Sequence, residues 1–423
     1  MSRLNAILLA IVAALWVPPA LSADPPPGTT PPGEDIDPAT GFARSSVVRP
    51  LVDPAAPPPG SSVAPVAPAP GTRAPDFGPT RIEGATRIDG KPGPVVEGKP
   101  HIALILPIAS APLGRLAEAV RQGFAAAAQA EGANAPPMVL YSVENDGAAV
   151  LDACRRAQAT GAMLVVAGLT RDGATNVARS ECARRPVLTL NQPLPDAAGD
   201  PNAPVYSISL SIEQEARQAA LLAVSEGWHS AIIIASQSAL SKRVVEAFER
   251  EWQRAAGDVA GRIAFSGGPD DAPLVKDRIA QMARGDMVFL ALDQPESRMV
   301  RPYVSGMLPV YATSLSVDPR AETMVNVDLQ GVRYMDMPWF VQPDHPAVMV
   351  YPQPRTPLPV DYERLYALGI DAFRIASVLA LGDKSKLALD GVTGRITLEG
   401  HQFARALTPA EIDGGRVIPL KNP

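Results

Sequence analysis

The sequence has few of the residues on which enzyme chemistry usually depends. It contains only 4 His and 2 Cys among 423 residues, and no His stands at metal-ligand spacing from another. HExxH sites and zinc sites built from several cysteines are therefore excluded. The chain also has no GxSxG elbow, no Walker loop and no GxGxxG fingerprint. It has no Ser three positions before a Lys, so the SxxK motif of serine nucleophiles is absent too. We therefore expect a protein that is not an enzyme and that carries no metal and no cofactor.

An excess of positive charge is also missing. The chain has 38 Lys and Arg against 44 Asp and Glu, which gives a net charge of -6, and its basic residues are spread along the sequence. Nucleic-acid binding depends on basic patches that neutralise phosphates. We therefore expect no nucleic acid among the partners.

Long apolar runs are absent except near the N-terminus. There Arg3 precedes an apolar run from Ala6 to Val17, and small residues follow up to Ala23. The run is too short to span a bilayer, so residues 1–23 are interpreted as a cleavable signal peptide. We expect a periplasmic protein whose mature chain has no transmembrane segment. No cysteine stands at the cleavage region, which argues against an outer-membrane lipid anchor.

Proline dominates the residues that follow. Many of the 46 prolines stand between residues 24 and 98, mixed with Gly, Ala and Ser, as in PPPGTTPPG and APPPGSSVAPVAPAP. Such a composition buries too little apolar surface to offset the entropy of ordering the chain. We expect a disordered Pro-rich arm over residues 24–98.

From residue 99 onward, apolar runs alternate with helical patterns. His101–Ile108 is a nearly continuous apolar run, as expected of a strand covered on both faces, and Leu113–Glu131 has apolar residues at helical spacing. Repeated strand and helix units indicate a parallel sheet with right-handed crossovers. Because the pattern begins again after Leu210, the predicted fold class is α/β, with two doubly wound parallel-sheet lobes joined by crossing strands.

The order of these elements sets the expected lobe limits. Lobe 1 is expected to comprise residues 99–208 and 331–400, and lobe 2 residues 209–330 and 401–423. A last pair of strands is expected at Gly394–Leu398 and Arg416–Leu420.

The two cysteines, Cys154 and Cys182, are predicted on consecutive helices on the same face of one sheet. Because an exported protein meets an oxidising compartment, we expect a structural disulfide between them. The alternative is a pair of buried free thiols.

Polar residues follow several predicted strands, where doubly wound sheets bind their ligands. The candidates for holding a small ligand in a cleft between the lobes are Ser110, Thr170, Asn191, Gln192, Ser236, Asp293, Thr313 and Ser314. The alternative is that such residues cap helices, since Ser, Thr, Asn and Asp are preferred at that position. Thr170 with Asp172, and Ser211 with Glu213, have the pattern of caps.

One segment, GVRYMDMPWFV at residues 331–341, gathers aromatic and Met side chains in a chain with only 5% aromatic residues. It stands between the second lobe and a long helical pattern, so we predict an extended segment that crosses back between the lobes. Tyr334, Met337 and Trp339 are the hinge candidates. Asp336 must be hydrogen-bonded or face the cleft, because an unpaired buried carboxylate is costly. It is therefore one more ligand candidate, and core packing with an interlobe hydrogen bond is its alternative.

Several stretches carry a family resemblance. LPVYATS, GVRYMDMPWF, LYALGIDAFRIA and LDGVTGRITLEG closely resemble, in order and spacing, the penicillin-binding protein activator (LpoA/LppC) family, over about residues 99 to 420. The resemblance implies a type I periplasmic-binding-protein fold. It also implies a regulator that binds a class A penicillin-binding protein, which is a peptidoglycan synthase, and that stimulates peptidoglycan synthesis in the cell wall.

The alternative function shares this fold. A periplasmic solute-binding protein of a transporter would bind an amino acid or a cell-wall fragment in its cleft. An amino-acid binder needs a carboxylate for the ammonium group and donors for the carboxylate, and Asp293, Asp336 and Thr170 are the residues that would supply them. A ligand screen separates the two functions, because a bound ligand stabilises the folded protein.

Overall fold

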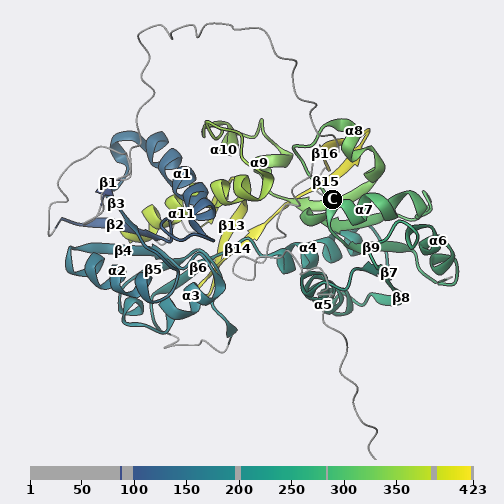
Figure 1. Cartoon of the computed structure of the whole chain (residues 1–423), viewed down its shortest axis with the longest axis horizontal. Helices are drawn as coiled ribbons and strands as arrows, with labels where there is room; N and C mark the ends of the chain where they lie inside the picture. The colour runs from purple at the N-terminus through teal and green to yellow at the C-terminus, as the bar shows by residue number, and fades with distance from the viewer. Residues whose placement is uncertain (1–85, 88–98, 196–201, 283, 383–387, 421–423) are drawn as a thin grey trace, which may run out of the picture. The chain divides into compact units, whose positions relative to one another are not determined.

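The computed structural model in Figure 1 describes residues 86–87, 99–195, 202–282, 284–382 and 388–420. The expected signal peptide and most of the expected Pro-rich arm lie outside these residues. One short part of the arm corrects the expectation of disorder: β1 (Thr86–Arg87) pairs antiparallel with the edge of a sheet, at β3 (Met138–Ser142). Two residues are enough for this pairing because the exposed backbone groups of an edge strand accept a partner.

The first sheet has nine strands in the order β1-β3-β2-β4-β5-β6-β14-β13-β12. The five strands β3, β2, β4, β5 and β6 run parallel, β14 continues them, and β13 and β12 complete the sheet as antiparallel neighbours. The bounds are β2 (His101–Leu106), β4 (Ala162–Ala167), β5 (Val187–Thr189), β6 (Val205–Ile208), β12 (Ala388–Gly391), β13 (Gly394–Glu399) and β14 (Gln402–Ala406). Strand β2 is buried along its whole length, as expected of a parallel strand covered on both faces.

Helices cover both faces of the first sheet (Figure 1). One face carries α1 (Gly114–Glu131) and α11 (Val360–Leu381), which share a core with β2 and β4. The other carries α2 (Ala148–Ala159), α3 (Arg171–Ala178) and η2 (Glu181–Arg184). We call this sheet with its helices the first lobe.

The second sheet has seven strands in the order β16-β15-β11-β10-β9-β7-β8. Its strands from β8 to β11 are parallel, and β15 and β16 are antiparallel at one edge. The bounds are β7 (Ser230–Ala235), β8 (Asp258–Ala264), β9 (Met287–Ala291), β10 (Val310–Thr313), β11 (Val332–Asp336), β15 (Thr408–Asp413) and β16 (Arg416–Pro419).

This sheet is also covered on both faces, and with its helices it forms the second lobe. α4 (Ile212–Ser225) and α5 (Ala239–Arg254) pack on one face, and α6 (Ala272–Ala280) and α7 (Gln294–Val300) on the other. Short helices complete the described chain: η1 (Gly132–Asn134), η4 (Arg301–Tyr303), η5 (Ser314–Ser316), α8 (Thr323–Asn326), η6 (Val327–Leu329), α9 (Pro338–Val341) and α10 (Pro346–Met349). The predicted α/β class with two parallel-dominated sheets is confirmed.

Three details differ from the sequence prediction. The segment 331–341 is extended only as far as Met337, because Pro338 occupies the first position of the helical turn α9. Strand β11 lies in the second sheet, not with the first lobe, and β14 lies in the first sheet. The two last predicted strands do not pair with each other, since β13 pairs with β12 and β14 while β16 pairs with β15.

Candidate functional site

Within the described residues, the chain passes between the two lobes at three places, which we call the crossing segments. They are residues 209–211 between β6 and α4, Met337 between β11 and α9, and Leu407 between β14 and β15. All three lie at the ends of strands, so the residues around them can interact with both lobes.

An ion pair between the lobes stands at the second crossing. Asp336 ends β11 of the second lobe, Arg364 lies on α11 of the first, and both side chains are buried. Arg364 donates through both Nη atoms, and its Nη2 lies 2.8 Å from Asp336 Oδ2. Burial alone would lower the pKa of Arg364, but the Asp336 carboxylate raises that pKa above its usual value. The pair links the two lobes.

A second carboxylate approaches this pair from α4. Glu215 is buried, and its Oε2 accepts a hydrogen bond of 3.0 Å from the backbone N–H of Ser314, which follows β10. Burial raises the pKa of Glu215 to about 7; Arg364 opposes this rise, and the carboxylate of Asp336 adds to it. Glu215 is thus a group that titrates near neutral pH inside the protein.

Arg405 of β14 completes what we call the buried charge cluster, which consists of Glu215, Asp336, Arg364 and Arg405. Its Nε donates to the carbonyl of Ser209 at 2.8 Å and its Nη1 to that of Thr393 at 3.0 Å. Its Nη2 has no hydrogen-bond partner among the described residues. Burial lowers the pKa of Arg405, against the opposing effect of the carboxylates of Glu215, Asp371 and Asp336.

Side chains of α4 bind the backbone of the third crossing through hydrogen bonds. Gln214 and Gln218 both donate through their side-chain amides to the carbonyl of Arg405, at 3.0 and 2.8 Å. The N–H of Leu407 donates in turn to Gln218 Oε1 at 2.8 Å. The first-lobe strand β14 is thereby bound to a helix of the second lobe.

Aromatic side chains flank the second crossing. Trp339 is fully buried, its Nε1 donates to Glu363 Oε1 at 2.8 Å, and its ring centroid lies 5.6 Å from that of Tyr366. The guanidinium groups of Arg320 and Arg364 lie 5.1 and 4.9 Å from the ring centroid of Phe340. The contacts with Glu363, Arg364 and Tyr366 hold α9 against α11 of the first lobe.

Several of the predicted ligand candidates cap helices. Thr170 caps α3 by accepting from the N–H of Gly173 at 2.9 Å, and its hydroxyl donates to the buried carboxylate of Asp146 at 2.7 Å. Ser211 caps α4, so both predicted caps are confirmed. Asp293 caps α7 in a capping box with Glu296.

The other candidates are distributed over the two lobes. Two of them are buried: Ser110 in the turn before α1 and Thr313 at the end of β10. Asn191 donates to the carbonyl of Leu169 at 3.1 Å, and Gln192 donates to Gln402 at 3.1 Å. Ser236 donates to Ser238 at 3.2 Å. The fold brings Ser314 and Asp336 together through Glu215. It likewise brings Ser236 and Asp293 together through Glu296, which interacts with both. The hinge candidates share one buried segment: Tyr334 packs in a second-lobe core, and Met337 and Trp339 in a first-lobe core.

Sequence reasoning missed Glu215, Arg364 and Arg405. Each could have been found as a charged residue at a position where the helix or strand pattern predicts an apolar one. Arg364, for example, lies four residues before Leu368 on the buried face of α11. No group of three or more His, Cys, Asp or Glu able to hold a metal occurs within the described residues. Within the same residues, no helix is long and apolar enough to cross a membrane.

The sequence matches one family over most of its length. The family model described as LppC putative lipoprotein matches residues 98–415. Penicillin-binding protein activator LpoA of Enterobacter sp. (strain 638) is 25% identical over 307 residues, which are 62% of this chain and 42% of that protein. LpoA of Mannheimia succiniciproducens is 26% identical over 332 residues, 75% of this chain and 55% of that protein. The chain thus spans about half the length of the curated relatives it matches.

Solved structures share the fold. One titled as a putative branched-chain amino acid ABC transporter from Chromobacterium violaceum is 38% identical, with a TM-score of 0.64 over 74% of this chain and 100% of that one. The C-domain of LpoA from Haemophilus influenzae, titled as a regulator of PBP1A, has 21% identity and a TM-score of 0.60 over 76% of this chain and 100% of its own. At that identity the second likeness indicates the fold alone, which is the periplasmic-binding-protein type predicted from the sequence.

Proposed function

This chain belongs to the LppC putative lipoprotein family, and on that basis we propose that it is a non-catalytic periplasmic regulator. In this proposal it binds a class A penicillin-binding protein and activates its peptidoglycan synthesis. The observation that carries the proposal is the family match over residues 98–415, whose relatives are named penicillin-binding protein activators. The name of those relatives supports a synthase as the kind of partner.

The use that the fold makes of its polar residues supports this proposal. Thr170, Asp293 and Asp336 are the residues that would bind the ligand of an amino-acid binder. In this fold Thr170 caps a helix, Asp293 forms a capping box and Asp336 forms an ion pair. A regulator needs no nucleophile and no specific small-molecule site, because it acts through a surface that its partner touches. We therefore favour the regulator over the solute-binding protein.

Through the crossing segments, a partner bound to one lobe would alter the conformation of the other. Tyr334 packs in a core of the second lobe, and Met337 and Trp339 pack in a core of the first. A change in the angle between the lobes must therefore repack this segment. We propose that Tyr334, Met337 and Trp339 act as a hinge whose position alters the surface offered to the synthase.

A binding experiment tests the proposed partner. The mature protein is immobilised and exposed to the purified class A penicillin-binding protein of its own cell, with an unrelated periplasmic solute-binding protein as the control. The proposal predicts saturable binding to this chain and none to the control. A parallel thermal-shift screen with free amino acids and peptidoglycan fragments tests the rival, since a small ligand would raise the melting temperature by mass action. Absence of synthase binding together with such a shift would contradict the proposal.

A further inference from the structure

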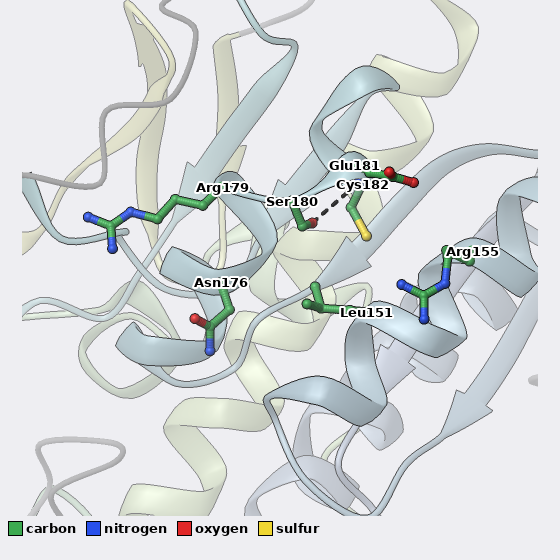
Figure 2. Close-up of a pocket in the computed structure, with 7 residues that line it drawn as sticks. All are labelled: Leu151, Arg155, Asn176, Arg179, Ser180, Glu181 and Cys182. Carbon is green, nitrogen blue, oxygen red and sulfur yellow. Dashed lines mark hydrogen bonds between the residues drawn. The ribbon is translucent and has the colours of Figure 1, made fainter.

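A pocket of about 450 Å³ lies on the helical face of the first lobe that carries α2 and α3, apart from the crossing segments (Figure 2). Its lining residues are Leu151, Arg155, Asn176, Arg179, Ser180, Glu181 and Cys182, and we call it the arginine pocket. Figure 2 shows Arg155 and Arg179 on either side of Leu151 and Cys182. The two guanidinium groups thus come from different helical segments.

The walls of the arginine pocket are fixed to each other. Cys154 of α2 and Cys182 of η2 form a disulfide, with their Cα atoms 6.0 Å apart. Gln158 of α2 donates to the carbonyl of Cys182 at 3.2 Å, and Ser180 Oγ accepts from the N–H of Cys182 at 3.2 Å. A pocket with covalently linked walls loses little conformational freedom when it binds a ligand. The entropy cost of ordering the site is therefore small.

The charge around the arginine pocket is opposite to that of the whole chain. Residues 148–190 contain six arginines and only three acidic residues, whereas the chain carries a net charge of -6. Five of these arginines are exposed, on α2, in the turn between α3 and η2, on η2 and directly after η2: Arg155, Arg156, Arg179, Arg184 and Arg185. The three acidic residues of this segment are exposed too, so its exposed side chains carry a modest excess of positive charge.

The chemistry of the arginines defines the ligand. A guanidinium group binds a carboxylate with two parallel hydrogen bonds, which lysine cannot do. Arg155 is paired with Asp152 on the same helix, but its side chain is 61% exposed, and exposed pairs of this kind contribute little stability. A carboxylate of a partner can therefore replace Asp152 at little cost. Three further exposed arginines, Arg156, Arg184 and Arg185, belong to α2 and η2 or directly follow η2, and do not line the pocket. A chain segment with several carboxylates matches such a set better than a single small anion does.

We propose that the arginine pocket is a docking site for an acidic segment of a protein partner, with Leu151 in contact with an apolar side chain of that segment. This inference rests on the proposed function in one respect, since it takes the partner to be the class A synthase. It adds to that function the surface through which the partner is held.

Charge reversal tests the docking site in the full mature protein. The double variant Arg155→Glu, Arg179→Glu is compared with Arg254→Glu, a matched control in which the arginine also pairs with an acidic residue three positions earlier on its helix and has a side chain 66% exposed. We expect the double variant to bind the synthase about tenfold more weakly, with a smaller dependence of affinity on salt, and the control to bind like the unaltered protein. Equal melting temperatures confirm that all three proteins are folded.

Each outcome decides the inference. Equal synthase binding by the double variant and the control overturns the docking site and leaves the proposed function intact. If the unaltered protein does not bind the synthase, the proposed function fails, and a fluorescent poly-glutamate peptide then decides the docking site separately. Binding of that peptide by the unaltered protein and its loss in the double variant support an acidic partner of another identity, whereas no difference overturns the inference.

Discussion

At the scale of single residues, the ion pair between Asp336 and Arg364 is a buried interaction that joins the two lobes. Its formation removes two charges from water, and that loss is offset only because each group finds its partner. The pair is therefore expected to specify how the lobes meet more than to add net stability. Removing one member has a different effect from removing both.

We predict that Asp336→Ala lowers the free energy of unfolding by about 3–5 kcal/mol, because it leaves the Arg364 guanidinium buried without its carboxylate. Urea denaturation measures the change. The matched control is Asp152→Ala, which breaks an exposed pair with Arg155 and should cost about 1 kcal/mol or less. Equal losses in the two variants would show that Asp336 is not buried with its partner.

A second prediction concerns Glu215 and pH. Burial raises the pKa of this carboxyl from 4.5 to about 7 in the folded protein. Between these values the folded state binds more protons than the unfolded chain, so the free energy of unfolding falls as pH rises. The stability that Glu215 contributes is thus fully present below pH 4.5 and lost by about pH 7.

Glu215→Gln removes this dependence, since the amide oxygen can still accept from Ser314 and no longer ionises. The melting temperature of the variant should rise relative to that of the unaltered protein as pH increases from 4.5 to 7. Glu322→Gln, at an exposed position, should show no such trend. A constant difference between Glu215→Gln and the unaltered protein over this range would contradict the burial of a neutral Glu215.

At the scale of elements, the packing of α1 on α11 depends on two glycines. A Cβ at Gly123 would overlap the carbonyl of Tyr366, and one at Gly369 would overlap that of Val120, so the helix backbones touch there. Phe124 and Phe373 pack edge to face beside this point, with ring centroids 5.4 Å apart. The close approach forms much of the first-lobe core.

We predict that Gly123→Ala destabilises the protein by at least about 1–3 kcal/mol, because the helices must separate to admit one methyl group. Thermal or urea unfolding followed by circular dichroism measures this loss. Gly306→Ala is the control, since a Cβ there meets no atom within 4 Å. A variant at Gly123 that is as stable as the one at Gly306 would mean that α1 and α11 do not pack this closely.

Another prediction concerns Trp339 of α9, which we propose as part of the hinge. Trp339→Phe keeps an aromatic ring in the first-lobe core but removes the bond from Nε1 to Glu363. We expect a loss of about 1 kcal/mol in stability and a reduced activation of the synthase with binding retained. Trp228→Phe is the control, because the Nε1 of Trp228 has no hydrogen-bond partner among the described residues. Full activation by a folded Trp339→Phe protein would exclude this bond from the hinge.

Most elements were predictable because their apolar residues follow the period of a helix or the continuous run of a buried parallel strand. Helix α1 was expected to begin at Leu113 and begins at Gly114, and β2 is the expected buried run. Strand β14 was missed because one of its buried side chains is Arg405, which breaks the apolar alternation. The helical turn α9 was missed because its four residues PWFV show no period.

At the scale of the whole described fold, the candidate site could be predicted only in part. Asp336 was identified as buried and in need of a partner, but Arg364 is 28 residues away, and Ser314 lies 99 residues from Glu215. Such pairs are fixed by how the sheets are placed at the crossing segments, and no local pattern encodes that placement. The family resemblance, in contrast, could be read from short stretches, and the match over residues 98–415 confirms it.

The two lobes are connected by more than the covalent chain. Three kinds of contact join them at the crossing segments. Asp336 forms an ion pair, and side chains of α4 donate hydrogen bonds to the carbonyl of Arg405. Residues 334–341 pack in cores of both lobes. We propose that, through these connections, a partner that binds one lobe influences the other. We therefore propose that this protein acts through contact with a partner and not through chemistry of its own.

The rate of peptidoglycan synthesis by the purified class A penicillin-binding protein, measured against the concentration of this protein, tests that role most directly. We predict that the rate rises and levels off at the concentration that saturates binding, and that this protein alone makes no product. A synthase rate that stays unchanged when the synthase is saturated with the protein, or product formed by the protein without a synthase, would contradict the account.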